Sequence, residues 1–184
     1  MVIKRPFVIK IRFETVYSYN LVFEILVGGQ RCLNKISLKN LLIIGLQFQH
    51  SSSGGVDGYN FGQQSAVKIH TADDITFSDC EFSHIGMIGF WVGYSNRVSI
   101  TNTVFFDIGY HGIMTFGGRS SKVYEDILVS NNLLDGCGIT NFWQPACIWA
   151  DGEKNITISN NEATNVPNHA IRYCLYDFKQ LSCK

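Results

Sequence analysis

The chain has 184 residues, with 15 Lys and Arg against 15 Asp and Glu, 46% apolar residues and 16% charged residues. A disordered chain would be poorer in apolar residues, and 13% aromatic residues are enough to fill a core. The charges are balanced and not clustered as nucleic-acid phosphates require, so we expect no nucleic-acid partner. We also expect no membrane span, because apolar runs such as 41–46 are far shorter than a bilayer needs.

Residues 1–35 alternate polar and apolar side chains, which predicts an N-terminal cap or a partial coil. Charged residues such as Lys4, Lys10 and Glu14 interrupt the apolar positions, so the segment is not typical of a signal peptide. The compartment is therefore not assigned by this segment. The next long stretch without periodicity, 51–62, is rich in Ser and Gly and is expected to be a loop.

A twelve-residue segment recurs in the remaining chain. It begins at Ile75, Val98, Ile127 and Ile156, and a weaker copy begins at Leu41. The four clear copies start 23, 29 and 29 residues apart, which is the period of a solenoid.

Each copy predicts three short strands per coil. The first and third residues are apolar and the second and fourth are mostly Ser or Thr, as in a half-buried strand. The fifth residue is expected to make a left-handed turn and a ladder of stacked polar side chains, at Asp79, Asn102, Asn131 and Asn160. The eighth residue begins a second inward strand, at Phe48, Phe82, Phe105, Leu134 and Ala163. A third strand has a small residue before an apolar one, so consecutive coils should stack as parallel sheets.

The pattern I-x-I-x-N-N-x-x-x-x-x-G, followed by G-I or A-I, resembles the repeat of right-handed parallel β-helix proteins of the pectate-lyase-like superfamily. The resemblance implies an all-β parallel β-helix over 36–178, of about five to six coils, with a tail at 179–184. It further implies a piece of a longer helix, an extracellular location, and a polysaccharide or oligosaccharide partner. Because the superfamily holds lyases, hydrolases, esterases, epimerases, tailspikes and adhesins, the fold does not fix the function.

In related enzymes the active face is the outward side of the third strand. The register predicts one outward row there, made of Lys68, Trp91, Met114, Trp149 and Arg172. It also predicts an adjoining outward row of small residues, made of Ala66, Gly89, Gly112, Cys147 and Ala170. A sugar ring stacks on an indole, so the expected substrate-binding residues are Lys68, Trp91, Trp149, His169 and Arg172. The alternative, weighed equally, is that each Trp packs under a long loop.

Acidic side chains near this face predict glycoside hydrolysis. The candidate catalytic residues are Asp107, Asp135, Asp151 and His111. Adjacent rungs lie about 4.8 Å apart, so two carboxyl groups could serve as acid and as base or nucleophile, with the imidazole positioning the sugar. The structural alternative is that Asp and His at strand corners cap turns. Two other functions stay open: a non-catalytic solenoid that binds glycans or a protein, and a fragment of a polysaccharide lyase.

Metal and cofactor sites are not indicated. A calcium-dependent lyase would need several acidic ligands. The only acid in the outward rows is Asp151, in a further row made of His70, Gly93, Phe116, Asp151 and Cys174. The six cysteines form no CxxC pair, so no zinc site is expected. Cys137 and Cys147 bracket a loop and could close it with a disulfide, although buried thiols explain both residues equally well.

Overall fold

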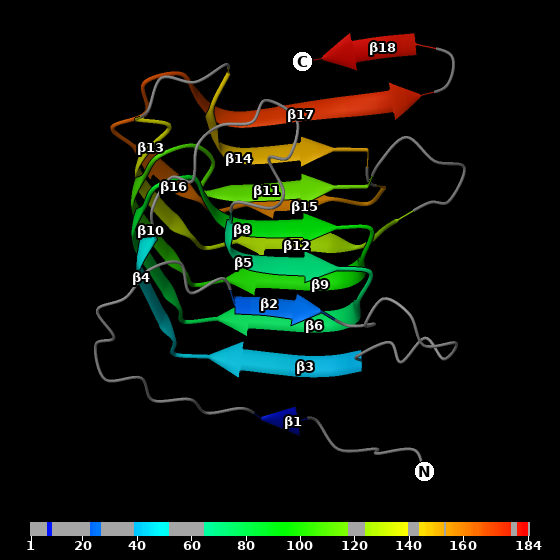
Figure 1. Ribbon diagram of the computed structural model, residues 1–184. Coiled ribbons are helices and arrows are strands. Elements are labelled where there is room, and N and C mark those ends of the chain that lie inside the picture. The colour runs from blue at the N-terminus through cyan, green and yellow to red at the C-terminus, as the bar shows by residue number, and fades with distance from the viewer. Residues whose placement is uncertain are drawn as a thin grey trace.

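The computed structural model is a three-sided solenoid in which each coil supplies one strand to each of three sheets (Figure 1). The structure describes residues 7–8, 23–26, 39–51, 65–117, 124–139, 144–152, 154–177 and 180–183. Within these ranges every named element is a strand. The predicted all-β parallel β-helix is therefore confirmed.

The three sheets are described by their strands in spatial order. The six-stranded sheet contains β1 (Phe7–Val8), β3 (Lys39–Ile44), β6 (Asp73–Ser78), β9 (Asn96–Thr101), β12 (Ile127–Ser130) and β15 (Thr157–Ser159). The five-stranded sheet contains β16 (Glu162–Thr164), β13 (Leu133–Cys137), β10 (Val104–Ile108), β7 (Glu81–Ile85) and β4 (Gln47–Ser51). The seven-stranded sheet contains β18 (Gln180–Cys183), β17 (His169–Asp177), β14 (Ala146–Asp151), β11 (Ile113–Phe116), β8 (Ile88–Gly93), β5 (Ser65–His70) and β2 (Phe23–Leu26).

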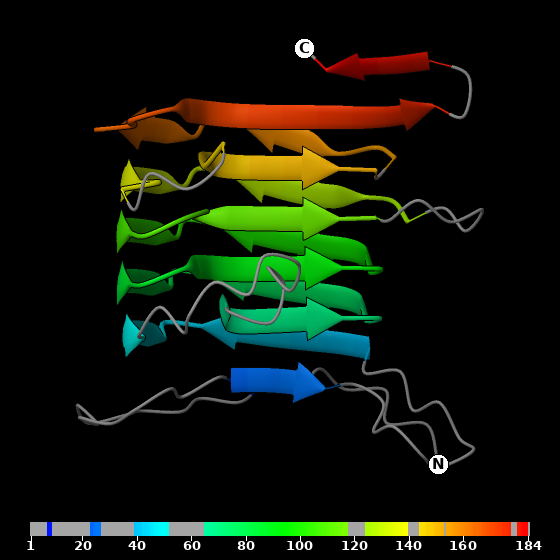
Figure 2. The ribbon, with the colours of Figure 1, turned by 45° about the horizontal axis from the view of Figure 1, so that its top comes forward.

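The coils stack one above the other from the N-terminal to the C-terminal end (Figure 2). Repeated inward positions pair in register, as where Val98 lies between Ile75 and Ile127. The Phe82 ring stacks between Phe48 and Phe105, with ring centroids 4.7 and 4.8 Å away. Because a single coil cannot bury its own apolar residues, this stacking along the axis creates the core.

The corner between the six- and five-stranded sheets contains a left-handed residue in each coil. Asp79, Asn102, Asn131 and Asn160 all have φ between 52° and 56°. This confirms the predicted turn. The predicted ladder is wrong by one residue, because these four side chains are exposed and the next residue carries the hydrogen bonds. In that next position, Asn132 Oδ1 accepts from the Thr103 amide, and Asn161 Oδ1 accepts from the Asn132 amide, each at 3.0 Å.

Strands are also described near both ends of the chain. β1 pairs with β3 and β2 pairs with β5, both in parallel, so parts of the 1–35 segment extend two sheets. β18 lies within the predicted tail and pairs antiparallel with β17. The predicted boundaries at 35 and 178 stay predictions. Within the described residues, no helix has the length and apolar character needed to cross a membrane.

Candidate functional site

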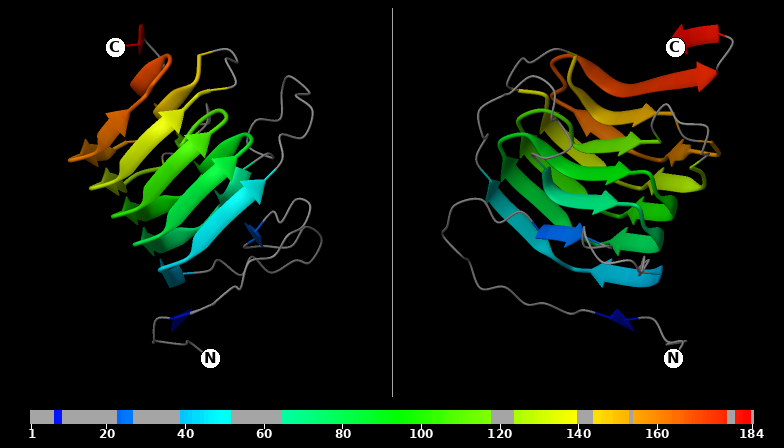
Figure 3. Two further views of the ribbon diagram at one scale, coloured as in Figure 1. Left: turned by 90° about the vertical axis from the view of Figure 1, so that its left-hand side faces the viewer. Right: turned by 45° about the vertical axis from the view of Figure 1, so that its right-hand side comes forward.

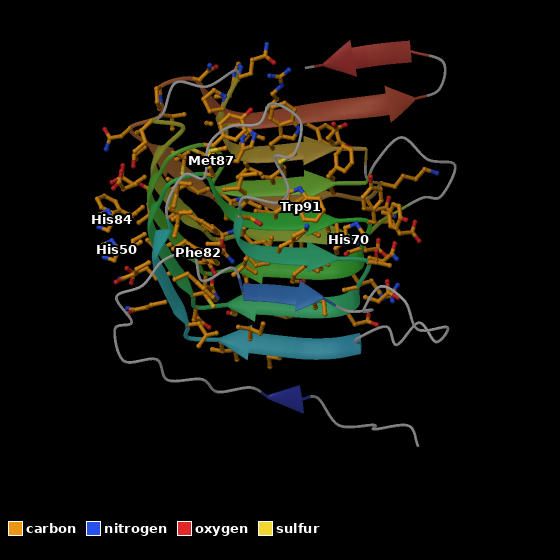
Figure 4. All side chains as sticks on the ribbon, viewed as in Figure 1. His50, His70, Phe82, His84, Met87 and Trp91 are labelled. Atoms are coloured by element: carbon orange, nitrogen blue, oxygen red, sulfur yellow. The ribbon has the colours of Figure 1, made fainter. Side chains whose placement is uncertain are left out.

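The outer face of the seven-stranded sheet carries the predicted outward row. The strand register places Trp91 beside Lys68 and Met114, and it places Trp149 beside Met114 and Arg172. The five side chains therefore lie on successive rungs along the helix axis, as the sequence predicts. Figure 4 shows Trp91 and His70 on this face of the solenoid.

Four of the five small residues of the adjoining row are not on this face, and only Ala170 in β17 is exposed. A Cβ atom built on Gly89 would lie 3.0 Å from the buried Phe105 ring, and one on Gly112 would lie 2.8 Å from Leu134. Ala66 and Cys147 belong to the core, at 4% and 0% exposure. The prediction was wrong because it assumed strict alternation. At the corner before the seven-stranded sheet, the small residue and the apolar residue after it both face inward. The outward position is therefore the residue before the small one.

In one coil that earlier position is Ile88, which belongs to a second apolar cluster. Trp91 is only 6% exposed and packs with Met87, Ile88 and Tyr110. Its ring lies so close over Gly93 that a Cβ atom there would overlap the indole. Lys68 Nζ lies 5.5 Å from the Trp91 ring centroid. Trp91 is therefore packed against Met87, Ile88 and Tyr110, none of which belongs to a long loop, whereas a sugar platform requires an exposed indole face.

Trp149 has a different environment, which we call the Trp149 site and define by Gln144, Trp149, His169 and Arg172. The Arg172 guanidinium lies 4.4 Å from the Trp149 ring centroid and also donates a hydrogen bond to Gln144 Oε1. Trp149 is half-buried and His169 is exposed. The Trp149 Nε1 atom is buried and has no hydrogen-bond partner within the described residues. A buried donor of this kind calls for an acceptor.

His111 lies directly beneath this site and is 1% exposed. His111 Nδ1 lies 3.1 Å from the Ala146 amide nitrogen and 3.2 Å from the Ala146 carbonyl oxygen, so the backbone of Ala146 holds the ring. Burial lowers the pKa of His111 to about 3. The imidazole is therefore neutral, and it anchors the start of β14 next to the Trp149 ring, 4.9 Å away.

The candidate acids lie on two different sheets. Asp107 on β10 and Asp135 on β13 are one rung apart on the five-stranded sheet, since Asp135 pairs with Phe106. Asp151 ends β14 on the seven-stranded sheet and is 7% exposed. Figure 3 shows the five-stranded sheet face-on in its left panel, apart from the seven-stranded sheet. The structure therefore places Asp107 and Asp135 on adjacent rungs of one sheet, one register position apart, and places Asp151 on a different sheet.

Each of these two carboxylates has hydrogen-bond partners in neighbouring coils. Asp107 Oδ2 lies 2.6 Å from His84 Nδ1. Asp135 Oδ1 accepts from Thr164 Oγ1 at 2.9 Å and from Asn165 Nδ2 at 2.6 Å. Asp107 also has φ of 55°, which gives it the turn geometry that Asp adopts more readily than most residues.

Comparison with known families agrees with this architecture. The family described as the right-handed beta helix region matches residues 37–176, which is most of the chain. The chain belongs to the right-handed β-helix family. No curated protein matches the chain, and no solved structure matches it either.

The β-helix also contains contacts outside the predicted outward rows. Gln144 lies before β14, outside the repeated positions, so no periodic signal could identify it. On the five-stranded sheet, His50 and His84 stack with ring centroids 5.2 Å apart beside Phe106, which is 45% exposed. Both histidines are labelled at the outer edge in Figure 4. Among the residues described, no three His, Cys, Asp or Glu side chains are placed to hold a metal ion.

Proposed function

We propose that this right-handed β-helix protein binds a polysaccharide or oligosaccharide along the outer face of the seven-stranded sheet. The observation that carries the proposal is the buried Trp149 indole N–H, which has no partner within the described residues and lies beside a guanidinium. A sugar hydroxyl can accept from the indole N–H. Sugars also present C–H groups that pack on aromatic rings.

The Trp149 site offers the polar groups that sugar hydroxyls need. Arg172 presents several N–H donors in a fixed plane, and Gln144 adds an amide that can donate and accept. His169 is exposed on the same strand as Arg172 and can contact the ligand directly. These groups support a sugar position at the edge of the Trp149 ring.

The outward row gives the ligand a direction. Lys68 and Arg172 are separated by four rungs, because Trp91, Met114 and Trp149 lie between them in register. At a rung spacing of about 4.8 Å, this row is roughly 19 Å long. A chain of several sugars running parallel to the helix axis fits this length better than a monosaccharide does.

Glycoside hydrolysis is the second candidate function, and it would take place on the five-stranded sheet. The observation that favours it is the position of Asp107 and Asp135 on adjacent rungs of one face. One carboxyl group would protonate the leaving oxygen, and the other would act as base or nucleophile. His84 would orient Asp107 through their hydrogen bond.

A glycan screen that reads binding and reducing-end release together tests both functions. Binding should fall at least tenfold in Trp149→Ala, and by about two- to tenfold in Trp149→Phe, which removes one neutral hydrogen bond. Phe106→Ala is the matched control, because it removes an exposed aromatic ring from another sheet. Equal loss of binding in Phe106→Ala, or none in Trp149→Ala, would contradict the proposed binding face.

The same screen separates binding from hydrolysis. If the chain is a hydrolase, Asp107→Asn should stop reducing-end release while binding at the seven-stranded sheet persists. Binding without any release by the unaltered chain would reject hydrolysis and leave the binding proposal standing.

A further inference from the structure

An exposed apolar patch lies on the outer face of the five-stranded sheet. Val104, Phe106 and Leu133 are 36%, 45% and 39% exposed, respectively. Val104 and Phe106 lie two residues apart on β10, so both point to the same side of the sheet, and Leu133 pairs with Val104 from the next strand. Single exposed apolar side chains are common on protein surfaces, but adjacent ones mark interaction sites.

Carboxylates surround this patch on successive rungs. The strands β7, β10, β13 and β16 carry one each, at Glu81, Asp107, Asp135 and Glu162. Glu81 pairs with Val104 and Glu162 pairs with Leu133, so acids stand at both ends of the apolar row. The five strands of this sheet contain no Lys or Arg, and within the described residues none of the four carboxylates forms an ion pair with Lys or Arg. We call the apolar patch and these four carboxylates together the acidic face.

A buried hydroxyl group lies in the same outward row as the Phe106 ring. Ser83 is 4% exposed, and the register places it between Gln49 and Phe106. Its Oγ atom has no hydrogen-bond partner in the part of the chain that the structure describes. Buried polar atoms without a partner are uncommon in native proteins. A Lys or Arg N–H that enters beside the Phe106 ring would supply a donor.

We propose that the acidic face is a docking site for a basic amphipathic helix of a partner protein. Charge complementarity requires Lys or Arg at the edge of the contact, and the patch requires apolar side chains at its centre. An apolar centre with a polar rim is the usual anatomy of a protein interface. An amino-sugar polymer would also be cationic, but its hydroxyl groups would lose water against Val104 and Leu133, which cannot hydrogen-bond to them.

The spacing of the carboxylates favours a helix over an extended segment. Rungs lie about 4.8 Å apart, so the four rungs span roughly 14 Å. A helix that lies along the solenoid axis presents the same side about every 5.4 Å, so three turns cover about 16 Å. An extended strand presents the same side about every 6.6 Å, and three such repeats cover about 20 Å. A helix therefore keeps its cations closer to the carboxylates of all four rungs.

This docking site goes beyond the glycan proposal, because it lies on a different sheet from the Trp149 site. It also differs from glycoside hydrolysis, which would use Asp107 and Asp135 as reacting groups, whereas docking needs no turnover. The two are measured separately. Reducing-end release reports hydrolysis, and peptide binding reports docking.

The test measures the binding of fluorescent helical peptides to the full-length chain by anisotropy. The first peptide carries Lys and Arg on both sides of a stripe of Leu and Phe. The second has Glu in place of every Lys and Arg, and the third has Gln in place of the apolar stripe. We expect saturable binding of the first peptide that weakens as salt is added, no binding of the second, and binding of the third that is weaker by about tenfold. A glucosamine oligomer that binds this face more tightly than the first peptide would overturn the choice of a protein partner.

Variants show whether the first peptide binds at the acidic face. Phe106→Ala should weaken its binding about tenfold, because aromatic side chains at the centre of an interface dominate affinity. Glu162→Gln should weaken it by about two- to fivefold at low salt. Glu125→Gln is the matched control, because it removes an exposed carboxylate that belongs to none of the five strands.

Phe106 and Glu162 are both exposed, so their variants should keep the fold, which circular dichroism checks. Undiminished binding in Phe106→Ala would overturn the proposal. An equal loss in Glu125→Gln and Glu162→Gln would also overturn it, since it would show attraction to negative charge anywhere on the molecule. No binding of the first peptide at low salt would overturn it as well.

Discussion

Asn132 joins three successive coils through its side chain and its amide. Its Oδ1 accepts from the Thr103 amide, and its Nδ2 donates to the Ile100 carbonyl and to Asn161 Oδ1. The side chain is 2% exposed, so water cannot replace these partners. Because buried polar groups cost free energy when unpaired, this residue should matter more than its exposed neighbour Asn131.

Asn132→Ala should lower the free energy of unfolding by about 2–4 kcal/mol, since it leaves buried donors and acceptors without partners. Asn131→Gly is the matched control, because Asn131 is exposed with φ of 56° and Gly adopts that conformation readily. Urea denaturation of both variants measures the difference. Equal losses in the two variants would contradict the assignment of the ladder to the Asn132 position.

His111 predicts a pH dependence of stability. Burial lowers its pKa in the folded state to about 3, whereas the unfolded chain has the ordinary histidine value near 6.5. The unfolded state therefore binds more protons in this window, and stability falls as the pH drops below about 6.5, by up to about 1.4 kcal/mol per pH unit. Above that pH the contribution is fully present.

The measurement is urea denaturation of the unaltered chain and of His111→Asn between pH 7 and pH 4. The Asn side chain can accept from or donate to the Ala146 backbone, but it does not titrate, so the loss toward low pH should be shallower. His169→Gln, which removes an exposed histidine, is the control and should keep the original slope. A slope unchanged in His111→Asn would show that this imidazole is not responsible.

Residue types alone predicted the left-handed turn at this corner. They did not determine which of two neighbouring residues is buried. The Asn-Asn pair at 131 and 132 contains a turn residue and a ladder residue, and both are the same amino acid. The left-handed turn was predicted correctly from the residue type. The ladder position depends on which of the two side chains the corner directs into the core, and the sequence pattern does not encode that direction.

At the scale of elements, the corner before the seven-stranded sheet is the least regular part of each coil. Two consecutive residues face inward there, and small residues fill the first of these positions in several coils. Gly112 is the most crowded, because a Cβ atom would contact Cys147, Leu134 and Cys137 at 2.8 to 3.0 Å. Little space exists for any side chain at this position.

Gly112→Ala should lower the free energy of unfolding by about 1–3 kcal/mol through overpacking. Gly136→Asn is the matched control. Gly136 has φ of +68°, which Asn tolerates, and its Cβ position is at least 3.8 Å from other atoms. Thermal denaturation should therefore show a near-neutral effect for this variant. A destabilisation as large as that of Gly112→Ala would contradict the packing argument.

Periodicity predicted the elements well where strict alternation holds. The outward row through Trp91 and Trp149 was correct, because each strand keeps its period of two after the corner. The row of small residues failed because alternation breaks at the corner itself. Gln144 was missed because it lies in a segment without repeats, and such a segment carries no register.

At the scale of the whole molecule, burial decreases in the last described coil. Ile100 in β9 is fully buried, whereas the equivalent Ile158 in β15 is half-buried and packs only at the edge of the core. In a solenoid each coil is stabilised by its neighbours on both sides. The central coils should therefore be more stable to local opening than β15 and β16.

Hydrogen exchange measures this gradient. Amides of β9 and β10 should exchange more slowly than those of β15 and β16, because fewer buried contacts oppose opening in the last coil. Ile100→Ala should cost about 2–5 kcal/mol, and Ile158→Ala clearly less. Uniform exchange rates along the axis, or equal costs for the two variants, would contradict this picture.

Fold and site differ in how far the sequence could specify them. The repeat spacing predicts the solenoid, because every coil repeats the same burial pattern. The composition of the site depends on the sheet to which each residue belongs. Asp107 lies in the five-stranded sheet, and Asp151 lies in the seven-stranded sheet. Their separation onto two faces was not predicted, because a register within one coil does not give distances between sheets.

Carbohydrate binding at the Trp149 site is tested by following the Trp149 indole N–H with nuclear magnetic resonance during titration with glycans from the screen. The signal is assigned by its loss in Trp149→Phe, and the buried Trp91 indole is the internal reference. We predict that a bound glycan shifts the Trp149 signal in a saturable way and leaves the Trp91 signal nearly unchanged. An unmoved Trp149 signal with every glycan, or shifts confined to the five-stranded sheet, would contradict carbohydrate binding at this face.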